Sequence, residues 1–119
     1  MDGGRTRIIS PLMDMTYYQN PIISFDTWFQ NTGGQASTPN DSLLIMLSNG
    51  LDTILLDYRT TNSGSEEWVS SEVYLDETFE LNNQMQIIVE TMDMNPGHLV
   101  EGGFDRLMVN SDNLGNNMI

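Results

Sequence analysis

Cysteine and lysine are both missing from this chain of 119 residues, and its continuous apolar stretches are short. Without cysteine there can be no disulfide, no thiol nucleophile and no thiolate ligand for a metal ion. No apolar run approaches the ~20 residues that a membrane-spanning helix needs. The first ten residues, MDGGRTRIIS, contain charges but no apolar h-region, so the sequence predicts no signal peptide. Either the protein is cytosolic, or the chain is a piece of a longer exported protein.

Cationic side chains are also few. Seventeen Asp and Glu residues face four arginines, which gives a formal net charge of −13. Such a surface repels phosphate backbones, so nucleic acid is not an expected partner. The acids are scattered along the chain, which argues against a disordered acidic tail. The charge suits divalent cations or a high-salt environment, and a solvated acidic surface is the simpler interpretation.

What the chain does contain is a series of strand-like segments. Seven runs are continuously apolar or alternate in polarity, and polar loops separate them. They span residues 7–15, 21–29, 42–47, 53–58, 68–75, 85–91 and 98–109. In the second run, alternate residues share the face that is expected in the core, namely Ile23, Phe25, Thr27 and Phe29.

Two local signals refine this pattern. Pro11 interrupts the first run, which is therefore expected to be an edge strand or a bulged one. Asn49-Gly50 lies between the third and fourth runs and is a strong hairpin signal. Seven strands at regular spacing, without a helical period, predict a single antiparallel β-sandwich domain. We expect it over residues 7–109, after an N-terminal extension at residues 1–6 and before a disordered tail at residues 110–119.

Five short motifs follow one another in a fixed order. They are Ile8-Ile9-Ser10-Pro11 with Asp14, Pro21-Ile22-Ile23-Ser24-Phe25 with Trp28, Asn40-Asp41-Ser42-Leu43 through Ser48-Asn49-Gly50, Trp68, and VEGGFDRL at residues 100–107. This order resembles the jelly-roll β-sandwich modules related to MAM domains and to galactose-binding-like carbohydrate-binding modules. The resemblance covers residues 7–109 and implies an antiparallel jelly roll. Such modules are often appended to secreted bacterial enzymes, which implies an extracellular or cell-surface location within a longer exported chain.

The chain departs from this family pattern in two places. Arg106 stands where the family has the second Asp of an Asp-Asp pair, and Gly102-Gly103 follow the preceding Glu. Family members also have a strand before the Ile-Ser-Pro motif. The resemblance therefore implies an N-terminally truncated domain, with a sheet edge free for self-association.

The resemblance further implies a structural Ca²⁺ with Asp105 as a side-chain ligand. Calcium takes six to eight oxygen ligands, so further carboxylates would be needed. The candidates by position are Asp41, Glu101 and Asp93. In the alternative interpretation, Asp105 accepts hydrogen bonds from backbone amides at a strand end, and Glu101 faces water or pairs with an arginine.

Aromatic residues are the candidates for ligand binding. Aromatic faces beside Asn, Gln and Asp can stack on a sugar ring while the polar groups bind its hydroxyls. The candidate residues are Tyr17, Tyr18, Trp28 and Trp68. In the alternative interpretation, the two tryptophans pack in the core or at its rim.

Nothing in the sequence predicts catalysis. His98 is the only histidine, and with neither cysteine nor lysine in the chain it forms no recognisable nucleophile–base pair. We therefore expect a non-catalytic accessory or interaction module of a secreted bacterial multidomain protein. A carbohydrate-binding module with a structural Ca²⁺ is the alternative. The expected partners are other domains of the parent protein or a glycan, and a membrane span is not expected.

Overall fold

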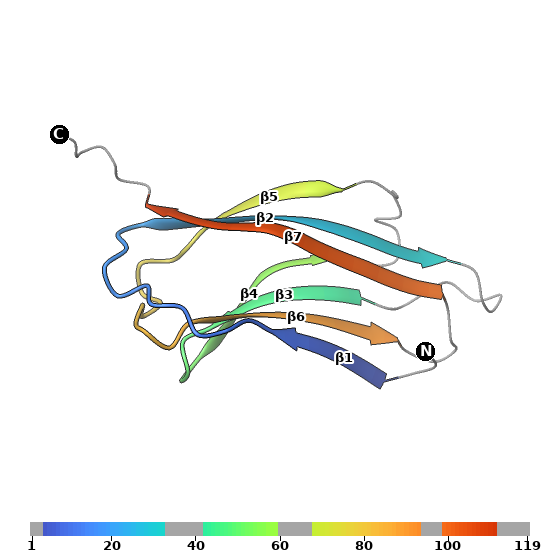
Figure 1. The fold of residues 1–119 in the computed structure, drawn as a ribbon, viewed down its shortest axis with the longest axis horizontal. Coiled ribbons are helices and arrows are strands. Elements are labelled where there is room, and N and C mark those ends of the chain that lie inside the picture. The colour runs from blue at the N-terminus through green and yellow to red at the C-terminus, as the bar shows by residue number, and fades with distance from the viewer. Residues whose placement is uncertain (1–3, 33–41, 60–67, 94–98, 112–119) are drawn as a thin grey trace.

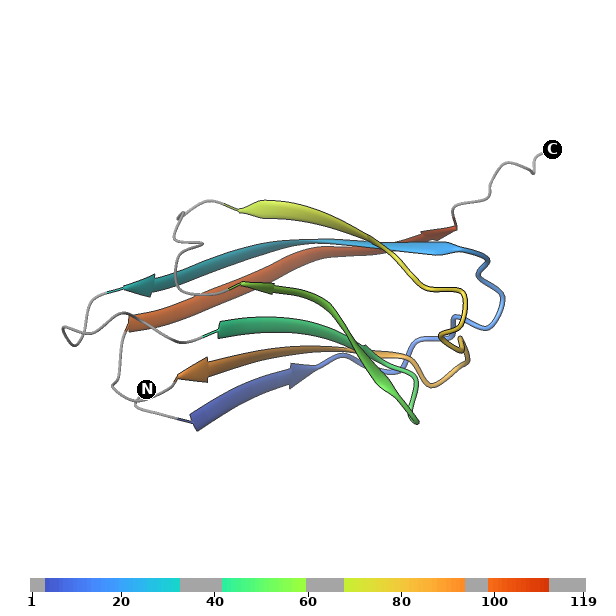
Figure 2. The same cartoon turned by 180° about the vertical axis from the view of Figure 1, so that it is seen from behind.

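The computed structural model describes residues 4–32, 42–59, 68–93 and 99–111. These residues form two antiparallel sheets packed face to face, as Figures 1 and 2 show from opposite sides. One sheet has the order β1-β6-β3-β4 and the other has the order β5-β2-β7. The strands are β1 (Gly4–Ile9), β2 (Pro21–Thr32), β3 (Ser42–Ser48), β4 (Thr53–Arg59), β5 (Val69–Tyr74), β6 (Gln86–Asp93) and β7 (Leu99–Ser111).

The predicted antiparallel β-sandwich is therefore confirmed, and each of the seven predicted segments overlaps one strand. A jelly roll has eight strands in two Greek keys. The seven described strands do not establish that order, so the jelly-roll part of the prediction is not confirmed. Among the described residues, none belongs to a helix that is long and apolar enough to cross a membrane.

Every strand differs from its predicted segment at one or both ends, mostly by one to three residues, and β2, for example, continues to Thr32. The largest difference is in β1. β1 begins at Gly4 and ends at Ile9, before Pro11, and only Met13 pairs again, in an isolated bridge to Met85. Proline has no N–H to give to a sheet, which explains the early end. At the other end of the chain, β7 continues to Ser111, two residues into the predicted tail.

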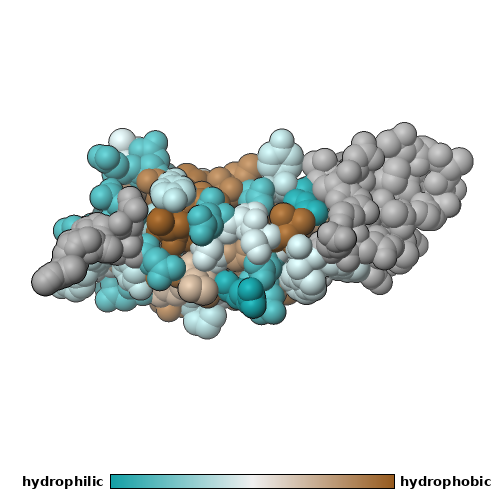
Figure 3. Space-filling model, turned by 90° about the horizontal axis from the view of Figure 1, so that it is seen from above, coloured by the Kyte–Doolittle hydropathy of each residue, from teal (hydrophilic) through white to brown (hydrophobic). Residues whose placement is uncertain are grey.

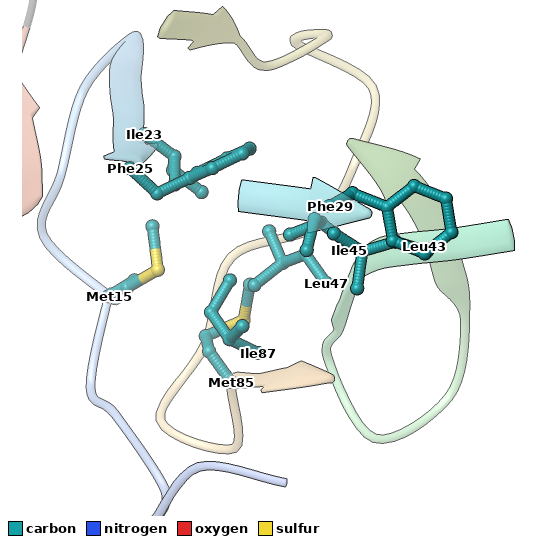
Figure 4. Packing of buried hydrophobic residues seen from close by; sticks show 9 residues of the cluster. All are labelled: Met15, Ile23, Phe25, Phe29, Leu43, Ile45, Leu47, Met85 and Ile87. Carbon is teal, nitrogen blue, oxygen red and sulfur yellow. The ribbon is translucent and has the colours of Figure 1, made fainter. Parts of the chain in front are cut away.

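The core lies between the two sheets and follows the alternation of the sequence. All four predicted core residues of β2 are buried, and Figure 4 shows three of them converging with side chains of the opposite sheet. Among the described residues, the buried apolar side chains of the core are Met15, Ile23, Phe25, Phe29, Leu43, Ile45, Leu47, Met85 and Ile87. The Phe25 and Phe104 rings of neighbouring strands lie 5.5 Å apart between centroids, which adds an aromatic contact within the core.

Hydrogen bonds link the two sheets on the side where β4 faces β5. The Ser71 hydroxyl donates to Asp57 Oδ2 at 3.0 Å, and Arg59 Nη1 donates to Thr27 Oγ1 at 2.9 Å. Thr27 is fully buried, so this bond satisfies a hydroxyl that would otherwise be costly inside the core. The interior of the sandwich is thus polar on this side.

A β-bulge interrupts the pairing of β2 with β7. Ser24 pairs with Met108 and Asp26 with Asp105, so Phe25 faces two residues, Arg106 and Leu107. Arg106 has a φ of 59°, in the left-handed region that non-glycine residues rarely adopt. Bulges redirect side chains locally, and this one lies on the face described next.

Candidate ligand-binding face

The outer face of the β5-β2-β7 sheet combines polar and aromatic side chains. Because Phe25, Thr27 and Phe29 point into the core, the alternating Asp26 and Trp28 point outward. The register places Ser70 of β5 and Asp105 of β7 on either side of Asp26. Figure 3 looks onto this face and shows hydrophilic side chains intermixed with separate hydrophobic ones.

A groove of about 630 Å³ crosses this face at the bulge. That volume falls within the range of about 300–1,000 Å³ that is usual for small-molecule sites. Its lining residues come from all three strands and are mostly polar: Ser24, Phe25, Asp26, Ser70, Ser71, Glu72, Arg106, Met108 and Asn110. The groove therefore offers hydroxyl, carboxylate, amide and guanidinium groups over a short distance.

Asp26 lines this groove from β2, the middle strand of the sheet. Its Oδ1 accepts a hydrogen bond from the Ser70 hydroxyl at 2.7 Å. Its Oδ2 lies 2.9 Å from Arg106 Nε. The carboxylate is only 16% exposed, whereas the Arg106 side chain is 74% exposed and leaves most of its guanidinium donors to solvent. The bulge thus places the exposed Arg106 guanidinium in contact with the nearly buried Asp26 carboxylate.

The Trp68 indole lies across Gly103 on the same face. A Cβ built on Gly103 would lie 2.9 Å from Trp68 Cη2, which is closer than real Cβ atoms approach other atoms. Glycine is therefore the residue that lets the indole rest on β7. Trp68 remains 54% exposed, so much of its surface is open to a ligand. Trp28, which pairs with Gly103 in the register, is half-buried on this face.

Of the predicted aromatic residues, Trp28 and Trp68 thus share a face, but the two tyrosines lie elsewhere. Tyr17 and Tyr18 precede β2 at its Pro21 end, about seven residues or ~23 Å along the strand from Trp28. Tyr17 is 89% exposed, and Tyr18 packs against the core. Tyr18 also lines a separate cavity of about 420 Å³.

That second cavity carries an acidic turn. Asp76 and Glu77 line it together with Phe79 and Leu81. The backbone N–H and the hydroxyl of Thr78 both donate to Asp76 Oδ1, and these bonds lower the pKa of the Asp76 carboxyl. Tyr18 is the only predicted ligand-binding residue in this cavity.

The predicted calcium ligands are only partly described. Asp105 is exposed on the outer face, where its Oδ1 accepts the Arg106 N–H at 2.8 Å. The side chains of Glu101 and Asp93 lie outside the described part of the structure, as does all of Asp41. Among the described side chains, no three His, Asp or Glu residues lie close enough together to hold a metal ion. The Ca²⁺ site stays a prediction.

Sequence reasoning missed the Asp26–Ser70–Arg106 group. Asp26 and Ser70 each occupy outward positions of an alternating pattern, but only the strand register shows that they are neighbours. In the sequence Arg106 stands out only as a departure from the family motif, and nothing in its sequence context predicts a bulge. His98, the only histidine, lies outside the described residues.

Comparison with known proteins adds no relative to this description. No protein-family model, no curated protein and no solved structure matches the chain.

Proposed function

We propose that this protein is a non-catalytic binding module that recognises a carbohydrate through the outer face of its β5-β2-β7 sheet. The observation that carries the proposal is the groove in which Asp26, Ser70 and Arg106 lie on the same sheet face as the exposed Trp68 indole. A sugar presents hydroxyls that both donate and accept hydrogen bonds, together with faces of C–H groups. The groove offers partners for the hydroxyls, and the indole offers an apolar plane for stacking.

The charged pair suits binding because both of its members are oriented before a ligand arrives. Each Asp26 oxygen accepts one bond within the protein and keeps further lone-pair capacity. Arg106 presents a planar set of donors that can bind two adjacent hydroxyls at once. Groups that are held in place lose little side-chain entropy on binding.

The groove lacks the nucleophile–base pair of a serine or cysteine hydrolase. None of its lining residues is a histidine, and the chain has neither cysteine nor lysine. Its serines therefore have no adjacent imidazole or amine to act as a base. Asp26, a carboxylate of the groove, is already held by Ser70 and Arg106, which suits a fixed hydrogen-bond acceptor for a bound ligand.

The test is affinity electrophoresis and calorimetry with a panel of soluble polysaccharides. We expect Arg106→Ala and Trp68→Ala each to weaken binding at least about tenfold, the value of one lost interaction of about 1.4 kcal/mol. Tyr17→Ala is the matched control, because it removes an exposed aromatic residue at the far end of β2. Equal affinity of the wild type and Arg106→Ala would contradict the proposed site.

A second observation favours the role of an accessory domain beside other domains. An apolar row crosses the outer face of the four-stranded sheet, and its members pair successively as Ile9, Ile88, Met46 and Leu55. Ile9 is 49% and Leu55 is 53% exposed. Another domain of a longer protein that packed there would bury this row. Hydrogen exchange would then be slower at β1 and β4 in the longer protein than in this chain, and equal exchange would contradict the packing.

A further inference from the structure

The side of the sandwich between β1 and β7 holds an apolar groove of about 300 Å³. It lies on the side opposite the polar bridges between β4 and β5. Residues of both sheets line it, among them Ile8, Leu43, Val89, Thr91, Gly102 and Phe104. It is therefore an opening into the layer between the sheets, and it is separate from the groove on the outer face.

Ile8 is the clearest sign that this layer is uncovered. It pairs with Val89, whose side chain packs against the core, so Ile8 points to the same inner side of the sheet. Yet Ile8 is 67% exposed. The cause is the unequal width of the two sheets. The sheet with β1 at its edge has four described strands, whereas the facing sheet has three, so β1 extends beyond the facing sheet.

The edge of β7 borders the same opening. β7 spans 13 residues and pairs with β2 on one side. No described strand pairs with its other side, which leaves a row of backbone N–H and C=O groups able to bond to a further strand. Gly102 faces inward here, and its missing side chain keeps the groove open above Leu43 and Thr91.

We propose that β7 and this groove accept one extended strand from another polypeptide segment, which pairs with the free edge of β7 and covers Ile8. Strand addition of this kind takes its affinity from main-chain hydrogen bonds and its specificity from alternate side chains. The added strand would bring the second sheet to four strands, equal to the first. This proposal is independent of the carbohydrate site.

The geometry favours a single strand over a second copy of this protein. β7 lies over β6 and β3, because a Cβ on Gly102 would meet Thr91 Cγ2 at 3.5 Å and Leu43 Cδ1 at 3.4 Å. β1 therefore extends one strand beyond β7. A second copy that paired antiparallel with β7, about a two-fold axis perpendicular to the sheet, would bring its own four-stranded sheet into the space of the first copy's four-stranded sheet. A lone strand meets no such obstacle.

The chemistry of the groove and the net charge of the chain determine which residue types the added strand should contain. Side chains that face Ile8, Val89 and Phe104 must be apolar, and they must occur at every second position. The intervening side chains point away from the core, next to Asp105 and beside a protein whose net charge is −13. Basic residues fit these positions, because opposite charges favour association. The expected partner is thus an extended segment that alternates aliphatic and basic residues.

The test uses a synthetic peptide of about ten residues that alternates valine with lysine or threonine, and a control peptide with proline at the central valine. We expect the first peptide to slow amide hydrogen exchange in β7 at least about tenfold near saturation. The proline peptide should not do so, because it lacks a ladder donor. Both peptides are titrated by fluorescence anisotropy in parallel.

Two matched variants locate the site. Ile8→Lys should weaken binding of the valine peptide at least about tenfold, whereas Leu55→Lys should leave it unchanged. Both residues are exposed aliphatics of the same sheet, but Ile8 faces inward and Leu55 outward. Protection of no β7 amide, or equal binding by both variants, would overturn the proposal. A peptide-free dimer with protected β7 amides would overturn it in favour of a second copy.

Discussion

Asn49 illustrates how a single side chain fixes a connection in this fold. It is 2% exposed in the turn between β3 and β4. Its Oδ1 accepts the N–H groups of Leu51 and Asp52, and its Nδ2 donates to the Glu80 carbonyl. Gly50 follows with a φ of 92°, a conformation that glycine adopts without strain. The Asn-Gly signal in the sequence predicted the turn, and the structure adds the link to Glu80.

Replacing Asn49 with alanine should be costly. The change removes three hydrogen bonds that the buried Asn49 side chain makes to the backbone, and each such bond contributes about 0.5–1.5 kcal/mol. We expect a loss of at least about 2 kcal/mol in the free energy of unfolding, measured by urea denaturation. Asn83→Ala, at an exposed position of a neighbouring turn, is the control and should cost much less. Equal losses would show that the hydrogen bonds of Asn49 contribute little.

Two exposed aspartates make stability depend on pH. The Thr16 hydroxyl and N–H lower the pKa of the Asp14 carboxyl, and the Thr78 N–H and hydroxyl lower that of Asp76. A carboxyl with a lowered folded-state pKa stabilises the protein above its unfolded pKa of about 3.9. That contribution is lost as the pH falls through the folded-state value.

The double variant Asp14→Asn with Asp76→Asn should isolate this contribution, because asparagine keeps the acceptor oxygen but cannot be protonated in this range. We expect the wild type to exceed the variant in stability at pH 6 by more than at pH 2.5. Urea midpoints at both values measure the difference. A gap that stays constant between the two pH values would rule out the linkage.

At the scale of elements, the outer-face positions of β2 could be predicted from the sequence, but the site could not. In the second segment, alternation places Ile23, Phe25, Thr27 and Phe29 toward the core and so leaves Trp28 on the opposite face. Register decides which outward residues meet, and it depends on packing across the whole sheet. The bulge at Arg106 depends on a backbone conformation for which arginine has no intrinsic preference. Asp26 and Arg106 were therefore found only in the structure.

The close contact of the Trp68 indole with Gly103 gives a prediction for the outer sheet face. Gly103→Ala places a methyl group in the position of the indole, so the ring must move. We expect a shift in tryptophan fluorescence and weaker carbohydrate binding, with a stability loss below about 1 kcal/mol because Trp68 is half exposed. Gly102→Ala is the control, since its methyl group meets Leu43 at an ordinary 3.4 Å. An unchanged spectrum in Gly103→Ala would contradict the stacked position of Trp68.

At the scale of the whole molecule, the series of strand-like segments predicted the class of fold and the composition gave the net charge, but neither predicted the unequal sides of the sandwich. Seven alternating segments sufficed to predict two antiparallel sheets. The polar bridges between β4 and β5, and the open groove between β1 and β7, follow from which strands lie at the edges. Edge position is a property of the assembled topology, so no single segment encodes it.

The net charge of −13 predicts a dependence of stability on salt. Mutual repulsion of the carboxylates destabilises the folded state, and salt screens it over a length of about 10 Å at 0.1 M. We expect the melting temperature to rise by several degrees between about 0.02 M and about 0.5 M sodium chloride. A melting temperature that falls with salt would show that the ion pairs of Arg7 with Glu90 and Arg106 with Asp26 outweigh the repulsion.

The most direct test of the proposed function is an NMR titration of the isotope-labelled protein with soluble oligosaccharides. Binding at the proposed face predicts shifts that are concentrated at Asp26, Trp68, Ser70 and Arg106, together with loss of binding in Arg106→Ala. Shifts confined to the Tyr18 end of the sandwich, or no shift with any oligosaccharide, would contradict the account.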